Sequence, residues 1–341
     1  MISLGIESTA HTFGIGIVSD EGKILANIKD IYRPKAGWGI IPREAAEHHK
    51  NIAETILEQS LKKSDLTLKD IDIVSFSQGP GLPPCLHEGL NFAKKISSEF
   101  DKPLVPVNHC VAHIEIARLF TNLRDPVVLY VSGGNTQVIS FVSGRYRIFG
   151  ETQDIGVGNA LDKFGREAGM QFPCGPKIEE LAKKGSWLDL PYVVKGMDLS
   201  FSGIVTEALK KLKKGERLSD LCFSLQEVFF SMLTEVTERA LAHTQKKEVI
   251  LTGGVAANKR LAKMLEIMCK ERGAEFAACP MEYSGDNGAN IAWAGILACK
   301  SSEKNSRKKD FKTEPFQRTD DAKIPWIENE MMNIKKRSNY L

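Results

Sequence analysis

The chain has 341 residues, which is enough for roughly two domains at about 150 residues each. With 42% hydrophobic and 26% charged residues, its composition is globular and excludes a largely disordered chain. The net charge is only +3 and is unevenly placed, because residues 300–341 hold eleven Lys and Arg against seven Asp and Glu. Residues 1–299 therefore carry 35 basic against 36 acidic side chains, which excludes a generally basic nucleic-acid binder and leaves recognition of any polyanion to local patches.

The cysteines and the N-terminus indicate the compartment. Seven cysteines are scattered without a C-x-x-C pair, which disfavours a disulfide scaffold, a zinc ribbon or a thioredoxin-like redox centre. The opening MISLGIESTA lacks the basic segment and long apolar stretch of a signal peptide, and no run approaches about 18 apolar residues. We therefore predict a reduced, cytoplasmic protein with no membrane partner.

The first half of the chain alternates strands and helices. Residues 2–27 read as a meander of three strands with glycine and polar turns. A helix is expected from Pro42, because proline suits a first helical turn and apolar residues follow at helical spacing. Apolar strands are expected at 71–77 and 105–109, each leading towards a helix, the first of them near 86–99. This alternation predicts an α/β sheet that contains parallel strands.

The opening pattern then recurs. Residues 127–149 again form strand, polar glycine turn, strand, glycine turn and strand, and residues 249–261 form a buried strand that opens onto a helix. Any α/β protein contains such pieces, but here both their order and their turn chemistry repeat, which favours an internal duplication with a cleft between the halves. Past Ala298 the apolar periodicity stops, and a tail with docked segments around Phe316 and 324–326 is expected.

Two histidines suggest a metal site. His109 and His113 stand four residues apart in NHCVAHIEIARLF, directly after an apolar strand, where open α/β sheets bind ligands. On a helix this spacing puts both imidazoles on one face, although two polar helix residues near an exposed edge would show it too. A zincin peptidase needs H-E-x-x-H, and Cys110 stands in the glutamate position, so a metallopeptidase is disfavoured.

Further ligands are expected among oxygen and nitrogen donors. Asp286 follows a glycine in SGDNGAN and precedes an apolar helix, so its carboxylate should lie at a helix N-terminus. A helix N-cap alone would also explain an aspartate at that position. Tyr130, in VLYVSGG, is either a strand aromatic or, more rarely, a phenolate ligand.

Glycine turns and nearby acidic residues suggest a nucleotide cleft. SGGNT (132–136) and TGGVAAN (252–258) offer unobstructed backbone N–H groups that can hold phosphates, although neither matches the Rossmann or Walker pattern. Asp162 and Glu179 could bond ribose hydroxyls, or lie on solvated helix faces. In REAAEHH, the run Glu47, His48 and His49 could line the cleft or an exposed helix face. The remaining cleft candidates are Glu7, His11, Lys163, Gly253 and Gly254.

Taken together, these strings resemble one known family at many separate points. The strings IESTAHTFGIGIV, REAAEHH, SQGPGL, NHCVAHIEIAR, LYVSGGNTQVI, GNALDKFGR, DLSFSG, LTGGVAAN and SGDNGANIAW are similar to the tRNA threonylcarbamoyladenosine synthase family, also known as the glycoprotease or O-sialoglycoprotein endopeptidase family. ESTAHTFG and YVSGGNTQVI are most similar to its archaeal and eukaryotic branch, the catalytic subunit of the KEOPS complex. The match runs from about residue 1 to 299, and QRTDDAKIPW resembles the family's tail.

The resemblance implies a fold and a domain organisation. The fold is the actin/hsp70/sugar-kinase-like (ASKHA) α/β fold, with two duplicated lobes and a central cleft. On this basis we expect a first lobe of residues 1–125 and about 290–327, a second lobe of residues 126–289, and a basic tail or linker at 328–341.

The resemblance also implies an enzyme, a tRNA N6-adenosine threonylcarbamoyltransferase. It would transfer the threonylcarbamoyl group from threonylcarbamoyl-AMP to the N6 amine of the adenosine 3′ of the anticodon in ANN-decoding tRNAs. The family binds one divalent metal ion per subunit, iron or, alternatively, zinc, at positions that fall on His109, His113, Tyr130 and Asp286. Its substrate contacts fall on Tyr130, Val131, Ser132, Gly133, Gly134, Asp162, Gly175, Glu179 and Asn258, and ATP or its analogues could occupy the same site.

The implied partners are tRNA, the other KEOPS subunits and the enzyme that supplies threonylcarbamoyl-AMP. The KEOPS subunits include a small atypical kinase and a small dimerising subunit, and nothing resembling a kinase lies within these 341 residues. The near-neutral body predicts that accessory subunits supply much of the grip on tRNA. One loop departs from the family, with Cys85, His87 and Glu88 where small or basic residues are usual.

Two other functions compete with the transferase. The first is a small-molecule phosphotransferase of the same fold, which explains the glycine turns but leaves the two histidines, the tyrosine and the aspartate without a shared role. The second is a non-catalytic, nucleotide-responsive scaffold.

Overall fold

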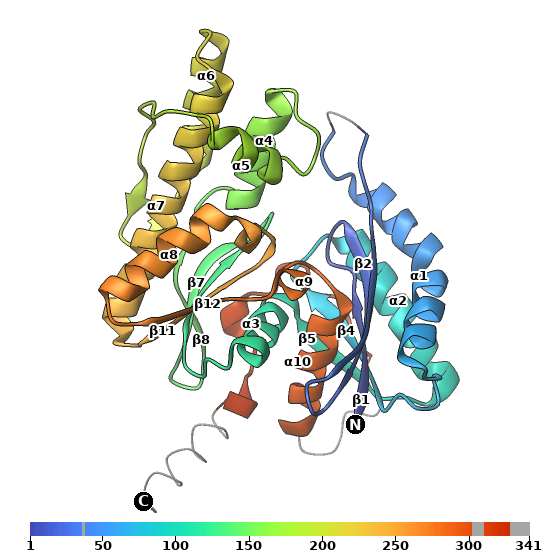
Figure 1. Cartoon of the computed structure of the whole chain (residues 1–341). Helices are drawn as coiled ribbons and strands as arrows, with labels where there is room; N and C mark the ends of the chain where they lie inside the picture. Colours follow the sequence, from blue (N-terminus) through green and yellow to red (C-terminus); the bar gives the residue numbers. More distant parts are fainter. Residues whose placement is uncertain (36–37, 302–309, 328–341) are drawn as a thin grey trace, which may run out of the picture.

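The computed structural model describes residues 1–35, 38–301 and 310–327, so the tail expected at 328–341 lies outside the described residues. Two five-stranded mixed sheets, each covered by helices, stand side by side in Figure 1. Strands near the N-terminus build the first sheet, and strands from the middle of the chain build the second. The predicted α/β architecture with two related lobes is therefore confirmed.

The first sheet has the strand order β3-β2-β1-β4-β5. Strand β1 pairs antiparallel with β2 and parallel with β4, so the predicted meander forms one half of the sheet. Helices α1 and α2 pack on one face and α10 packs on the other, which explains why β1 and β2 are almost fully buried. The elements are β1 (Ile2–Glu7), β2 (Thr12–Ser19), β3 (Ile24–Ile31), α1 (Pro42–Ser64), β4 (Ile73–Gly79), α2 (Pro83–Phe100), β5 (Leu104–Asn108) and α10 (Gly288–Ser301).

The second sheet repeats this connectivity in the order β12-β11-β6-β7-β8. Strand β6 pairs antiparallel with β7 and parallel with β11, as β1 does with β2 and β4. One face packs against the long helix α7 and its neighbours, and α3 covers the other. The elements are α3 (His109–Thr121), β6 (Val127–Val131), β7 (Thr136–Val142), β8 (Arg145–Glu151), α4 (Val157–Glu167), α5 (Gly175–Ala182), β9 (Val194–Lys195), β10 (Asp198–Leu199), α6 (Ser202–Lys213), α7 (Leu218–Thr244), β11 (Glu248–Thr252), α8 (Lys259–Glu271), β12 (Glu275–Ala278) and α9 (Met281–Ser284).

Residues 310–327, which we call the strap, run from the first lobe to the second. On the first lobe, Glu314 N donates to the carbonyl of Gln78 at 2.8 Å, and the ring of Phe311 packs on Phe76. On the second lobe, Thr319 Oγ1 donates to Gln137 Oε1 at 2.9 Å. The strap therefore ties the two lobes together.

One predicted anchor of the strap is wrong. The side chain of Phe316 is 91% exposed, because Pro315 and Phe316 form a turn that directs it to solvent. Farther along, Ile324 and Ile327 are buried in the hydrophobic cluster that α3 forms on the second sheet. The division of the chain at residues 125 and 290 stays a prediction.

The structure also bears on the expectations about thiols and membranes. All seven cysteines are free thiols, and six of them are buried. Among the helices in the described ranges, none has the length and apolar character needed to cross a membrane.

Candidate active site

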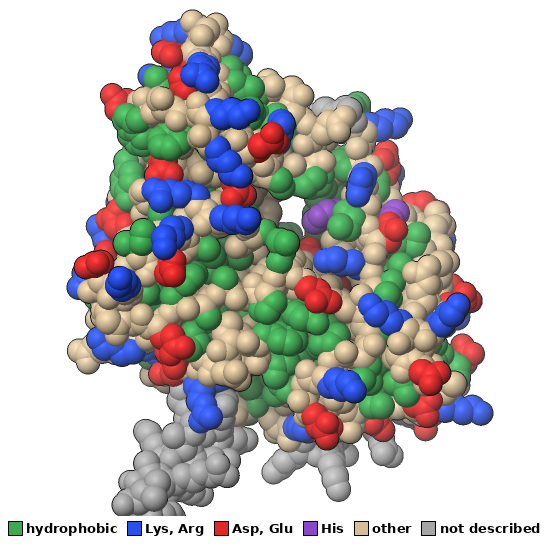
Figure 2. All heavy atoms as spheres, in the orientation of Figure 1, with side chains coloured by type: hydrophobic (Ala, Val, Ile, Leu, Met, Phe, Trp, Pro, Cys, Tyr) green, Lys and Arg blue, Asp and Glu red, His purple; other side chains and the backbone are tan. Residues whose placement is uncertain are grey.

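A cleft of about 790 Å³ separates the two lobes. Its first-lobe wall contains residues 9–12 around the turn between β1 and β2, together with Lys29 and Ile31 of β3 and residues 80–82. Its second-lobe wall contains the turn at 132–135 and parts of α4 and α5. Figure 2 shows the hollow between the lobes, with a histidine side chain at its edge. Both glycine turns predicted for a nucleotide cleft, 132–136 and 252–258, therefore contribute residues to its lining.

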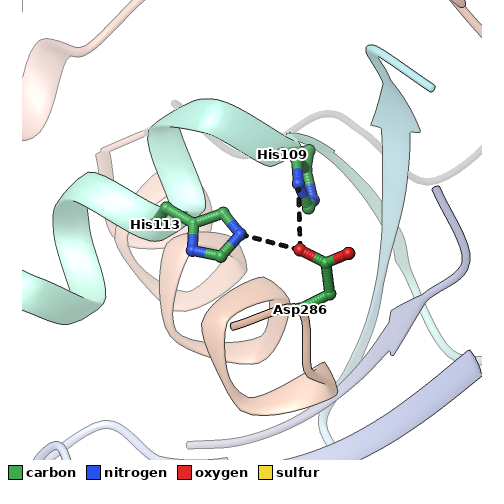
Figure 3. A group of neighbouring side chains, drawn as sticks. All are labelled: His109, His113 and Asp286. Carbon is green, nitrogen blue, oxygen red and sulfur yellow. Dashed lines mark hydrogen bonds and ion pairs between the residues drawn. The ribbon is translucent and has the colours of Figure 1, made fainter. Parts of the chain in front are cut away.

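His109, His113 and Asp286 meet at this cleft. One donor atom of each residue lies within 4.8 Å of the other two. Asp286 Oδ1 is 3.3 Å from His113 Nε2 and 3.6 Å from His109 Nε2 (Figure 3). Both imidazoles are buried, whereas 17% of the Asp286 side chain stays exposed. The structure thus brings together two candidate ligands predicted from their spacing and a third predicted from its loop motif.

Helix caps fix these positions. Asn108 Oδ1 accepts a hydrogen bond from Val111 N at 3.1 Å, so α3 begins at His109 and presents the two histidines one turn apart. On the other side, Asn287 Oδ1 accepts from Asn290 N at 3.2 Å at the start of α10. The alternative of Asp286 as an N-cap is therefore wrong, since its neighbour does the capping and its own carboxylate faces the histidines.

Carboxylates set the charge of the cluster. His109 Nδ1 lies 3.0 Å from Glu7 Oε2, a contact that turns Nε2 towards Asp286. Burial alone would lower the pKa of His109, but Glu7 and then Asp286 raise it to about 9. Burial lowers the pKa of His113 despite its bond to Asp286. Burial would raise the pKa of Asp286, yet the two histidines hold it well below its usual range.

Tyr130 adds a fourth polar group. Its side chain extends into the same buried region, where the ring centroid lies 5.1 Å from that of His113. Its hydroxyl is buried and has no hydrogen-bond partner among the described residues, and burial raises the pKa of the phenol well above its ordinary value. A buried orphan hydroxyl beside two imidazoles and a carboxylate fits a bound cation, and this donor set suits iron or zinc.

Glycines let the second-lobe wall close tightly. Ser132 N donates to the carbonyl of Asn135 at 2.8 Å, which closes the predicted glycine turn. The start of α4 lies against this turn, and a Cβ on Gly158 would be 2.7 Å from the Ser132 carbonyl oxygen. Across the cleft wall, Gly253 has a φ of +98°, and a Cβ there would be 2.3 Å from the Val131 carbonyl oxygen. Only glycine fits these two contacts.

Three of the predicted substrate-binding residues accept hydrogen bonds from backbone N–H groups of the protein itself. Asp162 Oδ1 accepts from Cys174 N at 2.7 Å, and burial raises the pKa of this carboxyl. Glu179 Oε1 accepts from the N–H of Lys259 at 3.0 Å, and Asn258 caps α8. These bonds join α4, α5 and α8 into one rigid wall.

Most of the predicted residues line the cleft, but some do not. The lining residues are His11, His109, Ser132, Gly133, Gly134, Asp162, Lys163, Gly175, Glu179, Gly254, Asn258 and Asp286. Those placed behind the lining are Glu7, His113, Tyr130, Val131 and Gly253. Glu47 is exposed on α1, and His48 is bonded to Asp30 instead of facing the cleft.

Sequence reasoning missed several groups. Lys29 Nζ donates to the backbone carbonyl of Asp286 at 2.9 Å, and nothing in its strand marks it as a site residue. Asn290 Nδ2 lies 3.4 Å from His113 Nδ1, and the SGDNGAN string could have pointed to it. Arg166 and Phe172 also line the cleft.

The fold and site define an ASKHA-type α/β protein with a His-His-Asp cluster in its cleft. Among solved structures, HypF of T. kodakarensis aligns with a TM-score of 0.62 and 17% identity over 88% of this chain and 47% of that chain. The Acidaminococcus fermentans (R)-2-hydroxyglutaryl-CoA dehydratase component A aligns with a TM-score of 0.56 and 16% identity, over 88% and 99%. At such identities these likenesses establish the fold alone.

Sequence comparison identifies the family. The profile of TsaD, tRNA N6-adenosine threonylcarbamoyltransferase, matches residues 23–293. Relatives of that name are 49% identical in Methanopyrus kandleri and 53% identical in Archaeoglobus fulgidus, each over 96% of this chain and 96% and 100% of theirs. A "probable bifunctional tRNA threonylcarbamoyladenosine biosynthesis protein" of Methanobrevibacter smithii is 50% identical, and this chain spans 63% of its length. The chain belongs to the tRNA N6-adenosine threonylcarbamoyltransferase family, a family of transferases, and the resemblance is confirmed.

Proposed function

We propose that this protein transfers the threonylcarbamoyl group from threonylcarbamoyl-AMP to the N6 amine of the adenosine 3′ of the anticodon in ANN-decoding tRNAs. The observation that carries this proposal is the cluster of His109, His113 and Asp286 in a cleft of about 790 Å³. Its support is the identity of about 50% to archaeal proteins named for this activity. A phosphotransferase would give the cluster no role.

His109, His113, Tyr130 and Asp286 would hold one divalent ion, with iron expected and zinc as the alternative. When bound, the ion would act as a Lewis acid towards the carbamate oxygen. The chain's own contribution is orientation, since Glu7 directs His109 Nε2 and Asn290 lies behind His113.

The cleft walls would position the adenylate. The exposed N–H groups of the turn at Gly133 and Gly134, beside the start of α4, are suited to the phosphate. Asp162, Gly175, Glu179 and Asn258 line the adjoining wall and would contact the adenosine. The N6 amine would then attack the carbamate carbon, so that a C–N bond forms, the C–O bond to phosphate breaks, AMP leaves and the amine loses a proton.

No covalent enzyme intermediate is needed in this scheme, because AMP is already a good leaving group. The thiols near the cleft are poor nucleophiles, since burial raises the pKa of Cys110 to about 12 and that of Cys174 to about 11. A threonylcarbamoyl adduct on the protein during turnover would contradict this part of the proposal.

The proposal includes partners and a compartment. We infer action in the cytoplasm with tRNA, with KEOPS subunits that include a small atypical kinase and a small dimerising subunit, and with the enzyme that makes threonylcarbamoyl-AMP. Residues 1–299 carry no net positive charge, so accessory subunits are expected to hold much of the tRNA. Full-strength tRNA binding by the chain without them would overturn this point.

Reconstitution tests the function. The assay combines threonine, bicarbonate, ATP, the intermediate-forming enzyme, accessory subunits and tRNA, and measures modified adenosine by mass spectrometry. We expect product only when this protein is present, and a loss of product and bound metal in the His109→Ala/His113→Ala variant. His243→Ala, an exposed histidine on α7, is the matched control and should keep both. Product without the protein, or undiminished product from the double variant, would refute the proposal, and ATP-dependent phosphorylation of a small molecule would favour the phosphotransferase.

A further inference from the structure

A chain of hydrogen bonds runs from the surface of α1 to the wall of the cleft. Asp30 Oδ1 lies 2.8 Å from His48 Nε2, and His48 Nδ1 lies 3.3 Å from His49 Nδ1. His49 Nε2 lies 3.0 Å from the carbonyl oxygen of Ala10, a residue that lines the cleft. The adjacent histidines of REAAEHH, which do not face the cleft themselves, thus reach it through a backbone carbonyl.

The partners at the two ends determine the protons along this chain. A carbonyl oxygen only accepts, so His49 Nε2 carries a proton. His49 is fully buried, and burial lowers its pKa to about 4, so the ring is neutral and its Nδ1 accepts. His48 Nδ1 must then donate, and His48 Nε2 must also donate to the Asp30 carboxylate. His48 therefore carries two ring protons, with its positive charge beside Asp30.

The carbonyl at the end of the chain belongs to the turn that forms the first-lobe wall. Each of three successive carbonyls in this turn is held by a different element. Leu82 N donates to Thr9 O at 2.7 Å, Tyr32 N donates to His11 O at 2.8 Å, and His49 donates to Ala10 O. Only the middle bond depends on a titratable side chain.

We propose that Asp30, His48 and His49 form a positioning relay that holds the Ala10–His11 turn in its ligand-binding position while His48 is protonated. The inference rests on the proposed function for the identity of the ligand, an adenylate. Glu7 precedes the turn and orients His109, so the turn connects the relay to both the metal cluster and the nucleotide wall.

The charged and titratable neighbours of the relay come from three elements. Glu7 and His11 flank it on the first hairpin, and both act electrostatically on His49. Asp30 and Tyr32 face His48 from β3 and the residues that follow it, and Tyr32 is bonded to Glu44 of α1. When His48 Nδ1 loses its proton, two nitrogen lone pairs face each other across the contact between His48 and His49. His49 then loses the bond that orients its ring and keeps the proton on Nε2, so the bond to Ala10 O weakens and the turn loses support.

Nuclear magnetic resonance of ¹⁵N-histidine-labelled protein tests the relay directly. We expect His49 as the neutral tautomer with its proton on Nε2, and His48 with a proton on both ring nitrogens while both of its hydrogen bonds are made, with assignments from His48→Asn and His49→Gln. The Nδ1–H tautomer of His49, or a His48 ring that bonds to His49 and Asp30 with a proton on only one nitrogen, would overturn the proposal whether or not the protein is a transferase.

Ligand affinity tests what the relay does. In His48→Asn the side-chain amide nitrogen can donate in place of Nδ1 and does not titrate. In His48→Leu the side chain has no donor. With ATP as probe and the full chain, the wild type should lose about tenfold in affinity as His48 deprotonates, the value of one hydrogen bond. The ATP affinity of His48→Asn should not fall with rising pH, and that of His48→Leu should be about tenfold weaker at every pH. The control His243→Asn, at an exposed position, should show the same pH dependence as the wild type.

Each outcome decides a separate point. Equal pH profiles for wild type, His48→Asn and His48→Leu would overturn the positioning role. In the transferase assay, His48→Leu should raise KM for the intermediate more than it lowers kcat, and an unfolding transition like that of the wild type would exclude a purely structural effect. Absence of ATP binding in the wild type would count against the proposed function, and the tautomers would then still decide the relay.

Discussion

Helix α10 lies directly on the first sheet because glycine occupies the contact points. A Cβ on Gly16 would stand 2.1 Å from the nitrogen of Ala289 and 2.4 Å from the carbonyl carbon of Gly288. Ordinary contacts begin near 3.4 Å, so Gly16→Ala must push the helix outwards by roughly 1.3 Å or distort the sheet. Both obstructing atoms are backbone, so we expect a cost at the upper end of the usual range for overpacking, about 3 kcal/mol.

The same displacement reaches the site. Helix α10 begins two residues after Asp286, so moving it changes the 3.3 Å and 3.6 Å distances from Asp286 Oδ1 to the two histidines. Gly16→Ala should therefore lower the occupancy of the proposed metal site as well as the stability.

Urea unfolding followed by circular dichroism, together with elemental analysis, measures both effects. The matched control is Gly203→Ala, because Gly203 is an exposed residue of α6 with open space where the methyl group would go. Alanine is the better helix former, so the control should gain about 0.5–1 kcal/mol. If Gly16→Ala unfolds within 0.5 kcal/mol of the wild type, the close-packing argument fails.

Two further predictions concern other carboxylates. Asp154 accepts hydrogen bonds from the backbone N–H and the hydroxyl of Ser202 at the start of α6. Burial alone would raise the pKa of Asp154, but its hydrogen bonds lower it to about 2. Its stabilisation should be complete above about pH 4 and disappear as the pH falls through 2, and Asp154→Ala should cost about 1 kcal/mol in thermal unfolding at pH 7 but nothing at pH 1.5. Glu115 is buried between Tyr146 and Arg118, at 2.7 and 2.8 Å, so Glu115→Ala should cost about 3–5 kcal/mol in urea unfolding. A cost below 1 kcal/mol would show that the buried ion pair is dispensable.

The sequence predicted the sheets better than the site. Both meanders follow from local signals, since glycine and polar turns separate apolar runs of strand length. No helix was predicted at 218–244, although the less buried residues of α7, among them Glu227, Ser231 and Glu235, recur at helical spacing. The exposed position of Phe316 depends on a turn at Pro315 that composition does not reveal.

Within the site, local spacing found His109 and His113, and the loop motif found Asp286. The bond from His109 to Glu7 could not be predicted, because it joins residues 102 positions apart through the packing of two elements. The partner of His48 could not be predicted either, because it depends on how α1 packs against the sheet. REAAEHH left open whether its polar side chains line the cleft or an exposed helix face. In the structure Glu47 is exposed, His48 is bonded to Asp30, and His49 is bonded to the carbonyl of Ala10, which itself lines the cleft.

The strap has a mechanical consequence. It is bonded to Gln78 on one lobe and Gln137 on the other, and it ends in the buried Ile324 and Ile327. A force that separates the lobes must therefore stretch or break the bonds of the strap to Gln78 and Gln137. The strap thus limits how far the two lobes can move apart.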